Sequence, residues 1–250
     1  MRLSLLGTGN AAGMPVYGCD CVHCHQAGEN ISQWRRPASA LLEIDNKKYL
    51  IDAGLTDITE RFSAGSLSGI FLTHFHVDHV QGLFHLRWGR GVQIPVYCPP
   101  DSTGCADLFK HPGILDFQVQ KKFSSFELDG LRITALPLIH SKVTHGYAFE
   151  YQGRCIAYLT DTKQLPPNTL AWFDAHPLDL LVIDTSYAPG MEKAGHNNLD
   201  DTLAIHNRLQ VKHTVLTHID HELDIWLAEH AHRLPESVSV GRDGRLVYPL

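Results

Sequence analysis

The sequence lacks any apolar run of the roughly 20 residues that a membrane-spanning helix needs. Residues 1–7 are too short to hold the apolar segment of a signal peptide, and they predict a first strand instead. We therefore expect a cytoplasmic protein with no membrane partner. Disulfide bonds are rare in that compartment, so the six cysteines need another explanation.

An excess of basic residues is missing as well. Lysine and arginine together number 21 against 27 aspartates and glutamates, which gives a net charge of −6. Proteins that bind nucleic acids generally present a basic surface, so we expect no large nucleic acid as a partner. The charge balance does not exclude a local basic pocket for one small anion.

No linker, low-complexity tract or internal repeat divides the 250 residues, and we predict a single domain over residues 1–250. Apolar, β-branched runs alternate with helical patterns along the whole chain, which is typical of an α/β fold. The predicted strands are residues 3–6, 40–44, 49–51, 70–72, 95–97, 131–136, 147–151, 155–159, 180–183 and 215–216. The predicted helices are residues 57–62, 79–88, 167–176, 199–209 and 220–232.

The most informative segment is Thr73-His74-Phe75-His76-Val77-Asp78-His79, which follows the apolar residues 69–72. Three imidazoles and one carboxylate in six positions suit borderline divalent metals such as zinc or manganese. His74 and His76 follow a predicted strand, whereas Asp78 and His79 begin a predicted helix and project toward a second point. The spacing therefore favours two adjacent metals over one.

Several other predicted strands also end in a side chain with ligand chemistry. These residues are Asp52, His140, Asp161 and His218. Each alone is at least as often structural, because a strand-end aspartate can cap a turn and a strand-end histidine can bond a carbonyl. Their order along the chain favours a role at one site, where rigid strands would hold a metal geometry fixed.

This pattern resembles the metallo-β-lactamase superfamily, whose signature is His-x-His-x-Asp-His followed by a distant histidine, an aspartate and a final histidine. The resemblance covers essentially the whole chain. It implies an αβ/βα four-layer sandwich with two divalent metals, manganese or zinc, in the cleft between its halves. Carried over by position, one metal would be held by His74, His76 and His140, and the other by Asp78, His79 and His218, with Asp161 bridging them. Asp52 would orient a ligand imidazole.

A second metal signal lies in residues 18–25, a predicted zinc knuckle loop with a Cys-x-Cys-x-x-Cys pattern: Cys19, Cys21 and Cys24. Three thiolates this close suit a tetrahedral structural zinc that lacks only its fourth ligand. The candidates for that ligand are His23, His25 and His221. The pattern is similar to the knuckle of the PhnP family, phosphodiesterases of bacterial phosphonate degradation, and this resemblance selects His221. The other cysteines are expected to be buried as small apolar groups: Cys98, Cys105 and Cys155.

The resemblance to this family implies hydrolysis of 5-phosphoribosyl 1,2-cyclic phosphate to ribose 1,5-bisphosphate, by attack of a hydroxide that bridges the two metals. The catalytic residues are then His196, near the leaving group, and Asp78. The second phosphate of this substrate needs a cationic subsite, and the sequence offers four candidates that it cannot rank: Arg35, Arg36, Arg87 and Lys142. A homodimer is implied by the family and by no pattern in the residues.

Three alternative functions share part of this pattern. A 2′,3′-cyclic nucleotide phosphodiesterase or a transfer-RNA 3′-processing nuclease would use the same ligands. The nuclease would carry a long basic arm, which we do not find in the sequence, and the net charge is against it. A cofactor-biosynthesis relative, the non-enzyme alternative, would have a degraded metal motif, whereas this chain keeps all seven ligand positions.

Overall fold

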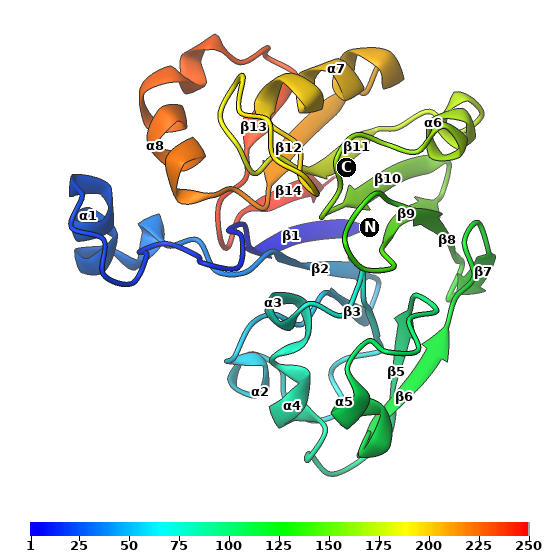
Figure 1. Cartoon of the computed structure of the whole chain (residues 1–250). Helices are drawn as coiled ribbons and strands as arrows, with labels where there is room; N and C mark the ends of the chain where they lie inside the picture. The colour runs from blue at the N-terminus through cyan, green and yellow to red at the C-terminus, as the bar shows by residue number, and fades with distance from the viewer. Residues whose placement is uncertain (250) are drawn as a thin grey trace.

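Two seven-stranded mixed sheets pack face to face at the centre of the computed structural model, which describes residues 1–249 (Figure 1). The first sheet has the order β14 (Leu246–Pro249), β1 (Arg2–Gly7), β2 (Ser39–Ile44), β3 (Lys47–Ile51), β4 (Gly69–Phe71), β5 (Ile94–Cys98) and β6 (Leu115–Val119). The second has the order β13 (Val238–Val240), β12 (His213–Thr217), β11 (Leu180–Asp184), β10 (Arg154–Leu159), β9 (His145–Tyr151), β8 (Leu131–Pro137) and β7 (Ser125–Leu128). Apolar side chains from both sheets form the core between them.

Helices cover the outer faces of both sheets. Against the first sheet lie α2 (Ile58–Arg61), α3 (Val77–Val80), α4 (Leu83–Leu86) and α5 (Ala106–Lys110). Against the second lie α6 (Pro167–Asp174), α7 (Leu199–Leu209) and α8 (His221–His230). The expected four-layer sandwich is therefore confirmed. Within residues 1–249, no helix combines the length and apolar character that a membrane crossing requires.

Parallel pairing brings chemically different strand ends to the same edge of each sheet. Strands β3 to β6 run parallel, and so do β10 to β13. The central strands are buried on both faces; every residue of β11, Leu-Leu-Val-Ile-Asp, is buried. The carboxyl ends of these strands carry the predicted ligands.

Ten strands were predicted and all ten are present, but four others were missed: β6, β7, β13 and β14. These four are the edge strands of the two sheets. An edge strand buries less of its surface, so its apolar pattern is weak, as in β7, where exposed and half-buried residues alternate.

The single helix predicted over residues 79–88 is not continuous in the structure. The segment forms two short helices, α3 and α4, with Gly82 between them. A Cβ atom at Gly82 would lie 2.2 Å from the carbonyl oxygen of Leu55, so the chain can pack here only because residue 82 has no side chain. The other four predicted helices are present, and two helices were missed: α1 (Val22–Glu29) and α5.

The cysteine-rich segment stands to one side of the sandwich, where α1 (Val22–Glu29) projects from the main body (Figure 1). The predicted loop over residues 18–25 is only half loop, because α1 begins inside it. Cys21 is the N-cap of this helix, and its sulfur accepts a hydrogen bond from the backbone amide of Cys24. The short 3₁₀ turn η1 (Ile31–Gln33) follows and leads back to β2.

Candidate metal centre and active site

Three of the predicted site residues end a strand in a backbone conformation that L-residues rarely adopt. Asp52 follows β3, Asp161 lies two residues beyond β10, and His218 follows β12, with φ angles of 56°, 62° and 58°. Such left-handed residues turn the chain sharply, and their strain is tolerated where the surroundings hold them. The turn leaves each side chain at the open edge of the sheets.

The first group of predicted ligands converges at this edge: His74, His76, His140 and Asp161 offer atoms that lie within 4.8 Å of one another. Nε2 of His74 and Nε2 of His140 lie 2.8 and 3.0 Å from Nδ1 of His76. The same two Nε2 atoms lie 3.9 and 3.6 Å from Oδ1 of Asp161. Three imidazole nitrogens and one carboxylate oxygen thus surround one point.

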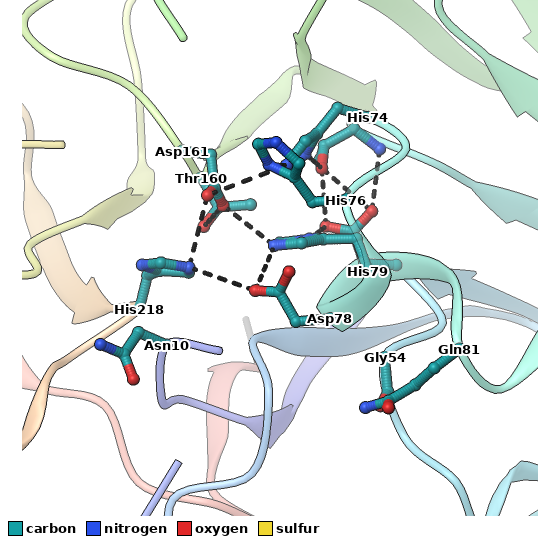
Figure 2. A network of polar contacts seen from close by, with 12 residues as sticks. Asn10, Gly54, His74, His76, Asp78, His79, Gln81, Thr160, Asp161 and His218 are labelled. Carbon is teal, nitrogen blue, oxygen red and sulfur yellow. Dashed lines mark hydrogen bonds and ion pairs between the residues drawn. The ribbon is translucent and has the colours of Figure 1, made fainter. Parts of the chain in front are cut away.

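The second group, Asp78, His79 and His218, meets the first at Asp161 (Figure 2). Nε2 of His79 lies 3.1 Å from Oδ2 of Asp161, and Nε2 of His218 lies 3.4 Å from Oδ1. Oδ2 of Asp78 faces the same two nitrogens at 3.3 and 3.8 Å. Asp161 therefore lies between both groups, the position that the resemblance implies for it.

The outward-facing nitrogen of each of four histidines is held by an oxygen. Nδ1 of His74 lies 3.0 Å from Thr73 Oγ1, and Nδ1 of His140 lies 3.0 Å from the carbonyl of Gly195. Nδ1 of His79 and of His218 lie 2.8 and 2.9 Å from Asp52 Oδ2 and Ser186 Oγ. These contacts fix the rings with Nε2 inward, as outer partners of metal-binding histidines do. Asp52 thus has the predicted place beside His79.

Burial and the carboxylates divide these histidines into two electrostatic classes. Burial lowers the pKa of His74, His76 and His140 below the usual 6.5. Burial would also lower the pKa of His218, but Asp161, Asp78 and Asp184 outweigh it and raise that pKa to about 9. In the same way Asp161 and Asp52 raise the pKa of His79. The charged form is therefore favoured only for the two histidines whose neighbouring carboxylates outweigh burial, His79 and His218.

Two buried nitrogens at the centre have no hydrogen-bond partner among the described residues: Nε2 of His79 and Nε2 of His218. Both lie close to carboxylate oxygens without the geometry of a hydrogen bond, although a buried polar atom normally has a partner. The donor set of imidazole nitrogens and carboxylate oxygens is one that binds zinc or manganese. The residues thus fit divalent metal ions.

His196 lies beside this cluster on the loop before α7. Its ring stacks on that of His218 at 4.8 Å, and its Nδ1 lies 2.8 Å from Oδ2 of Asp184. Asp184 is fully buried at the end of β11, and its other oxygen accepts a hydrogen bond from Ser186, which contacts His218. One carboxylate therefore orients both His196 and His218.

Sequence reasoning missed Asp184 and Ser186. The signal for Asp184 was present, since it ends a predicted apolar strand as Asp161 and His218 do. Asn198 is the N-cap of α7 and forms a capping box with Asp201. Asn197 instead donates to the Asp184 carbonyl and accepts from the Gln164 amide.

A pocket of about 750 Å³ opens above the cluster. Five of the seven candidate ligands form its floor: His76, Asp78, His140, Asp161 and His218. Its walls come from three loops, with Asn10, Ile139, Ser141, Tyr187 and His196 among the lining residues. The candidate ligands are thus reachable by a small molecule from one side.

The cysteine motif forms a separate group with His221, the first residue of α8. The sulfurs of Cys19 and Cys21 lie 3.6 and 3.2 Å from Nε2 of His221. The backbone amide of Cys24 lowers the pKa of Cys21 to about 6, whereas burial raises that of Cys24 to about 11. The other two candidates, His23 and His25, are not members of this group. Cys98 and Cys155 are buried as expected, but Cys105 is partly exposed.

The four basic residues suggested for a second phosphate are all paired with carboxylates elsewhere. Arg35 is buried against Asp224 at 2.5 Å, Arg87 contacts Asp107 at 2.7 Å, Arg36 contacts Asp243 at 3.6 Å, and Lys142 contacts Asp101 at 3.7 Å. None of the four lines the pocket over the candidate ligands. The structure therefore argues against all four candidates.

A sequence model of the Beta-lactamase superfamily domain matches residues 47–219, so the chain belongs to the metallo-β-lactamase superfamily. Within that class it is similar to the crystal structure of a diphosphatase from the PhnP family, with 27% identity, a TM-score of 0.83, and coverage of 100% of this chain and 98% of the other. A zinc-bound PqqB from Methylobacterium extorquens, 20% identical with a TM-score of 0.80 and full coverage of both chains, shares the fold. The resemblance that the sequence indicated is confirmed.

Two curated relatives differ in the names they carry. An octanoyltransferase of Porphyromonas gingivalis is 27% identical over 98% of this chain and 51% of the relative. A ribonuclease Z of Methanosarcina acetivorans is 24% identical over 74% of this chain and 82% of the relative. The chain spans about half the length of the first relative, so the activity in that relative's name is not assigned to this chain. Together these likenesses support a hydrolase or nuclease of the metallo-β-lactamase fold with metal-binding groups.

Proposed function

We propose that this protein is a metal-dependent phosphodiesterase that hydrolyses 5-phosphoribosyl 1,2-cyclic phosphate to ribose 1,5-bisphosphate, a reaction of phosphonate catabolism. The observation that carries the proposal is the position of Asp161 between two ligand groups, with His196 beside them at the floor of an open pocket. The similarity to a diphosphatase of the PhnP family supports a phosphate ester as substrate.

The first metal would be held by His74, His76 and His140, and the second by Asp78, His79 and His218, with Asp161 shared. The chemistry that the two metals supply is neutralisation of the phosphoryl oxygens and acidification of water. A structural zinc would be held by the three cysteines and His221. The protein fixes these side chains before substrate arrives, because their outward nitrogens are already bonded.

His196 is placed to act on the leaving group. Its Nδ1 faces Asp184, which leaves Nε2 available to a ligand in the pocket. With protons on both nitrogens, this ring can protonate the departing ribose oxygen, and the contact with Asp184 holds the ring in place. Opening the cyclic diester then uses one water. Its oxygen forms a new P–O bond and loses a proton, while the P–O bond to the departing ribose oxygen breaks and that oxygen takes a proton from His196.

The alternatives differ in the size of their substrates. A 2′,3′-cyclic nucleotide would place the same kind of diester over the metals, whereas a transfer-RNA precursor would need a basic surface along its length. The net charge of −6 and the pairing of the four basic candidates favour a small diester over RNA. A non-catalytic cofactor-biosynthesis role would leave His196 and Asp184 without a purpose.

The test is a comparison of kcat/KM for the cyclic ribosyl phosphate, a 2′,3′-cyclic nucleotide and a transfer-RNA precursor, with metal content measured on the same preparation. We expect the first substrate to be preferred and His196→Ala to depress turnover while metal content stays constant. Preference for the RNA, or no turnover of any diester by metal-loaded protein, would refute the proposal.

A further inference from the structure

The loop before α7 forms one wall of the catalytic pocket and is anchored on both sides of its tip. The side chain of Asn198 donates to the carbonyl of Met191 at 3.0 Å, and the carbonyl of Gly195 lies 3.0 Å from Nδ1 of His140. Between these two anchors the chain presents Lys193. The main chain that carries this lysine is therefore fixed relative to the candidate metal ligands.

Lys193 lies over an aromatic ring at the pocket rim. Its Nζ is 4.4 Å from the ring centroid of Tyr187, and Tyr187 lines the pocket. The Tyr187 ring lies edge-on to that of His196, with 6.1 Å between centroids. The Tyr187 ring thus holds the ammonium group on one side and contacts the His196 ring on the other.

No carboxylate among the described residues lies within 4.0 Å of Lys193, which is exposed. The adjacent Glu192 is bound by Lys163 at 2.9 Å, and the Asp220 carboxylate accepts the amide of Leu223 at 2.7 Å. The four basic residues considered earlier are all paired, as is Lys163. Lys193 is therefore a cation beside the pocket whose charge is available to a ligand.

We propose that Tyr187 and Lys193 form a subsite for a second anionic group of the substrate, separate from the diester over the metals. This inference rests on the proposed function and names the group that selects the substrate. A lysine ammonium is a common phosphate ligand. Nζ of Lys193 lies 4.4 Å from the Tyr187 ring centre, and that ring centre lies 6.1 Å from the ring centre of His196, so Tyr187 links the ammonium group to the side of the pocket where His196 lies.

The experiment uses two diesters that differ only in the second phosphate: 5-phosphoribosyl 1,2-cyclic phosphate and ribosyl 1,2-cyclic phosphate. The wild-type protein should prefer the phosphorylated diester in kcat/KM. Lys193→Met keeps the apolar stem and removes the charge, so it should reduce this preference by about 10-fold, chiefly through KM, as loss of one charge-assisted hydrogen bond would. Lys193→Arg should restore most of it, and bis(p-nitrophenyl) phosphate should be hydrolysed equally by all three proteins.

Two further lysine variants complete the experiment: one tests an alternative position for the subsite, and the other is a control for loss of a lysine charge. Lys142→Met removes a charge from a neighbouring loop, and Lys212→Met removes one that is paired with Asp179 at the far end of β12. Both should retain the preference. Retention by Lys193→Met, or loss in Lys142→Met alone, would overturn the subsite.

Failure of the proposed function has a different signature. If metal-loaded protein hydrolyses none of these diesters, the function is refuted and the subsite is judged by calorimetry with ribose 1,5-bisphosphate and ribose 1-phosphate. Tighter binding of the bisphosphate by wild type, lost in Lys193→Met, would still support the subsite. Equal binding of both by wild type would overturn it.

Discussion

Asp184 holds two functional histidines with one buried carboxylate. Its oxygens accept hydrogen bonds from the amide of Thr162 at 2.9 Å and from Ser186 at 2.7 Å, and lie 2.8 Å from His196. Through Ser186 it also reaches Nδ1 of His218. The charge on one side chain thus orients a predicted metal ligand and the predicted leaving-group histidine.

Replacement Asp184→Asn should lower kcat/KM for bis(p-nitrophenyl) phosphate by about 10- to 100-fold and weaken metal retention, because outer partners of ligands tune both. The measurement is kinetics together with metal content after dialysis, with thermal unfolding as a check on folding. Asp174→Asn, at an exposed position, is the matched control. Unchanged activity in a folded Asp184→Asn protein would contradict the assigned role.

His145 gives the protein a pH-dependent stability that does not involve the metal cluster. This residue begins β9, is 2% exposed, and has a pKa that burial lowers to about 4. The unfolded chain binds this proton near pH 6.5, so stability should fall as the pH drops from about 6.5 to 4 and level off below, by up to about 3 kcal/mol.

The prediction for His145 is read from urea unfolding at several pH values in the presence of a chelator. Stability of His145→Gln relative to wild type should rise as the pH falls through this window. The exposed His232→Gln should follow wild type at every pH. A constant difference between His145→Gln and wild type from pH 7 to 4 would show that His145 titrates normally.

Among the elements, α1 has little of its own to keep it folded. Its buried residues are only Cys24 and Ala27, and it projects from the sandwich (Figure 1). The cysteine group ties it to His221 at the start of α8, three residues beyond His218. We therefore expect a metal in this group to hold the projecting segment and to steady the end of β12.

Cys24→Ser should release about one zinc per chain and lower the thermal unfolding midpoint, because three remaining ligands hold the metal poorly. Diester turnover should fall as well, because His221 lies only three residues beyond His218 and its displacement would disturb the position of that candidate ligand. Zinc analysis and calorimetry measure the two effects, with Cys105→Ser as the control for loss of a thiol outside the group. Unaltered zinc content in Cys24→Ser would remove Cys24 from the site.

The elements show where sequence patterns carry information. Strands that are buried on both faces, such as β11, appear as continuous apolar runs and were predicted. The four missed strands all lie at sheet edges, where local composition does not report pairing with a neighbour. The break at Gly82 was missed because it depends on the carbonyl of Leu55, which approaches from a distant part of the chain.

For the site, sequence identified residues whose chemistry is unusual in itself, and spacing grouped those that lie within six positions. The predicted groups of ligands are brought together as expected. Residues whose role depends on contacts that form only in the folded chain were not recognised. These are Asp184 and Ser186, which lie behind the histidines, and Lys193, which lies over Tyr187. The four basic candidates failed because sequence does not show which charges are already neutralised by acidic neighbours.

At the scale of the whole molecule, the site exists because two sheets bring their strand ends to one edge. Five of the site residues follow strands of the first sheet: Asp52, His74, His76, Asp78 and His79. In the second sheet, Asp161 and His218 follow strands and Asp184 is the last residue of β11. Asp161 contacts ligands from both halves. The geometry of the ligand cluster therefore depends on the packing of the two sheets, and we expect both to be lost together on unfolding.

The most direct test of the account is a metal titration of chelator-stripped protein in which bound metal and hydrolysis of 5-phosphoribosyl 1,2-cyclic phosphate are recorded together. We predict that metal bound at the cysteine group alone gives no turnover. Activity should appear only as the pair at Asp161 fills, at about three metals per chain in total. A protein that binds this complement and hydrolyses no phosphodiester, or one that is fully active with only the cysteine group filled, would contradict the account.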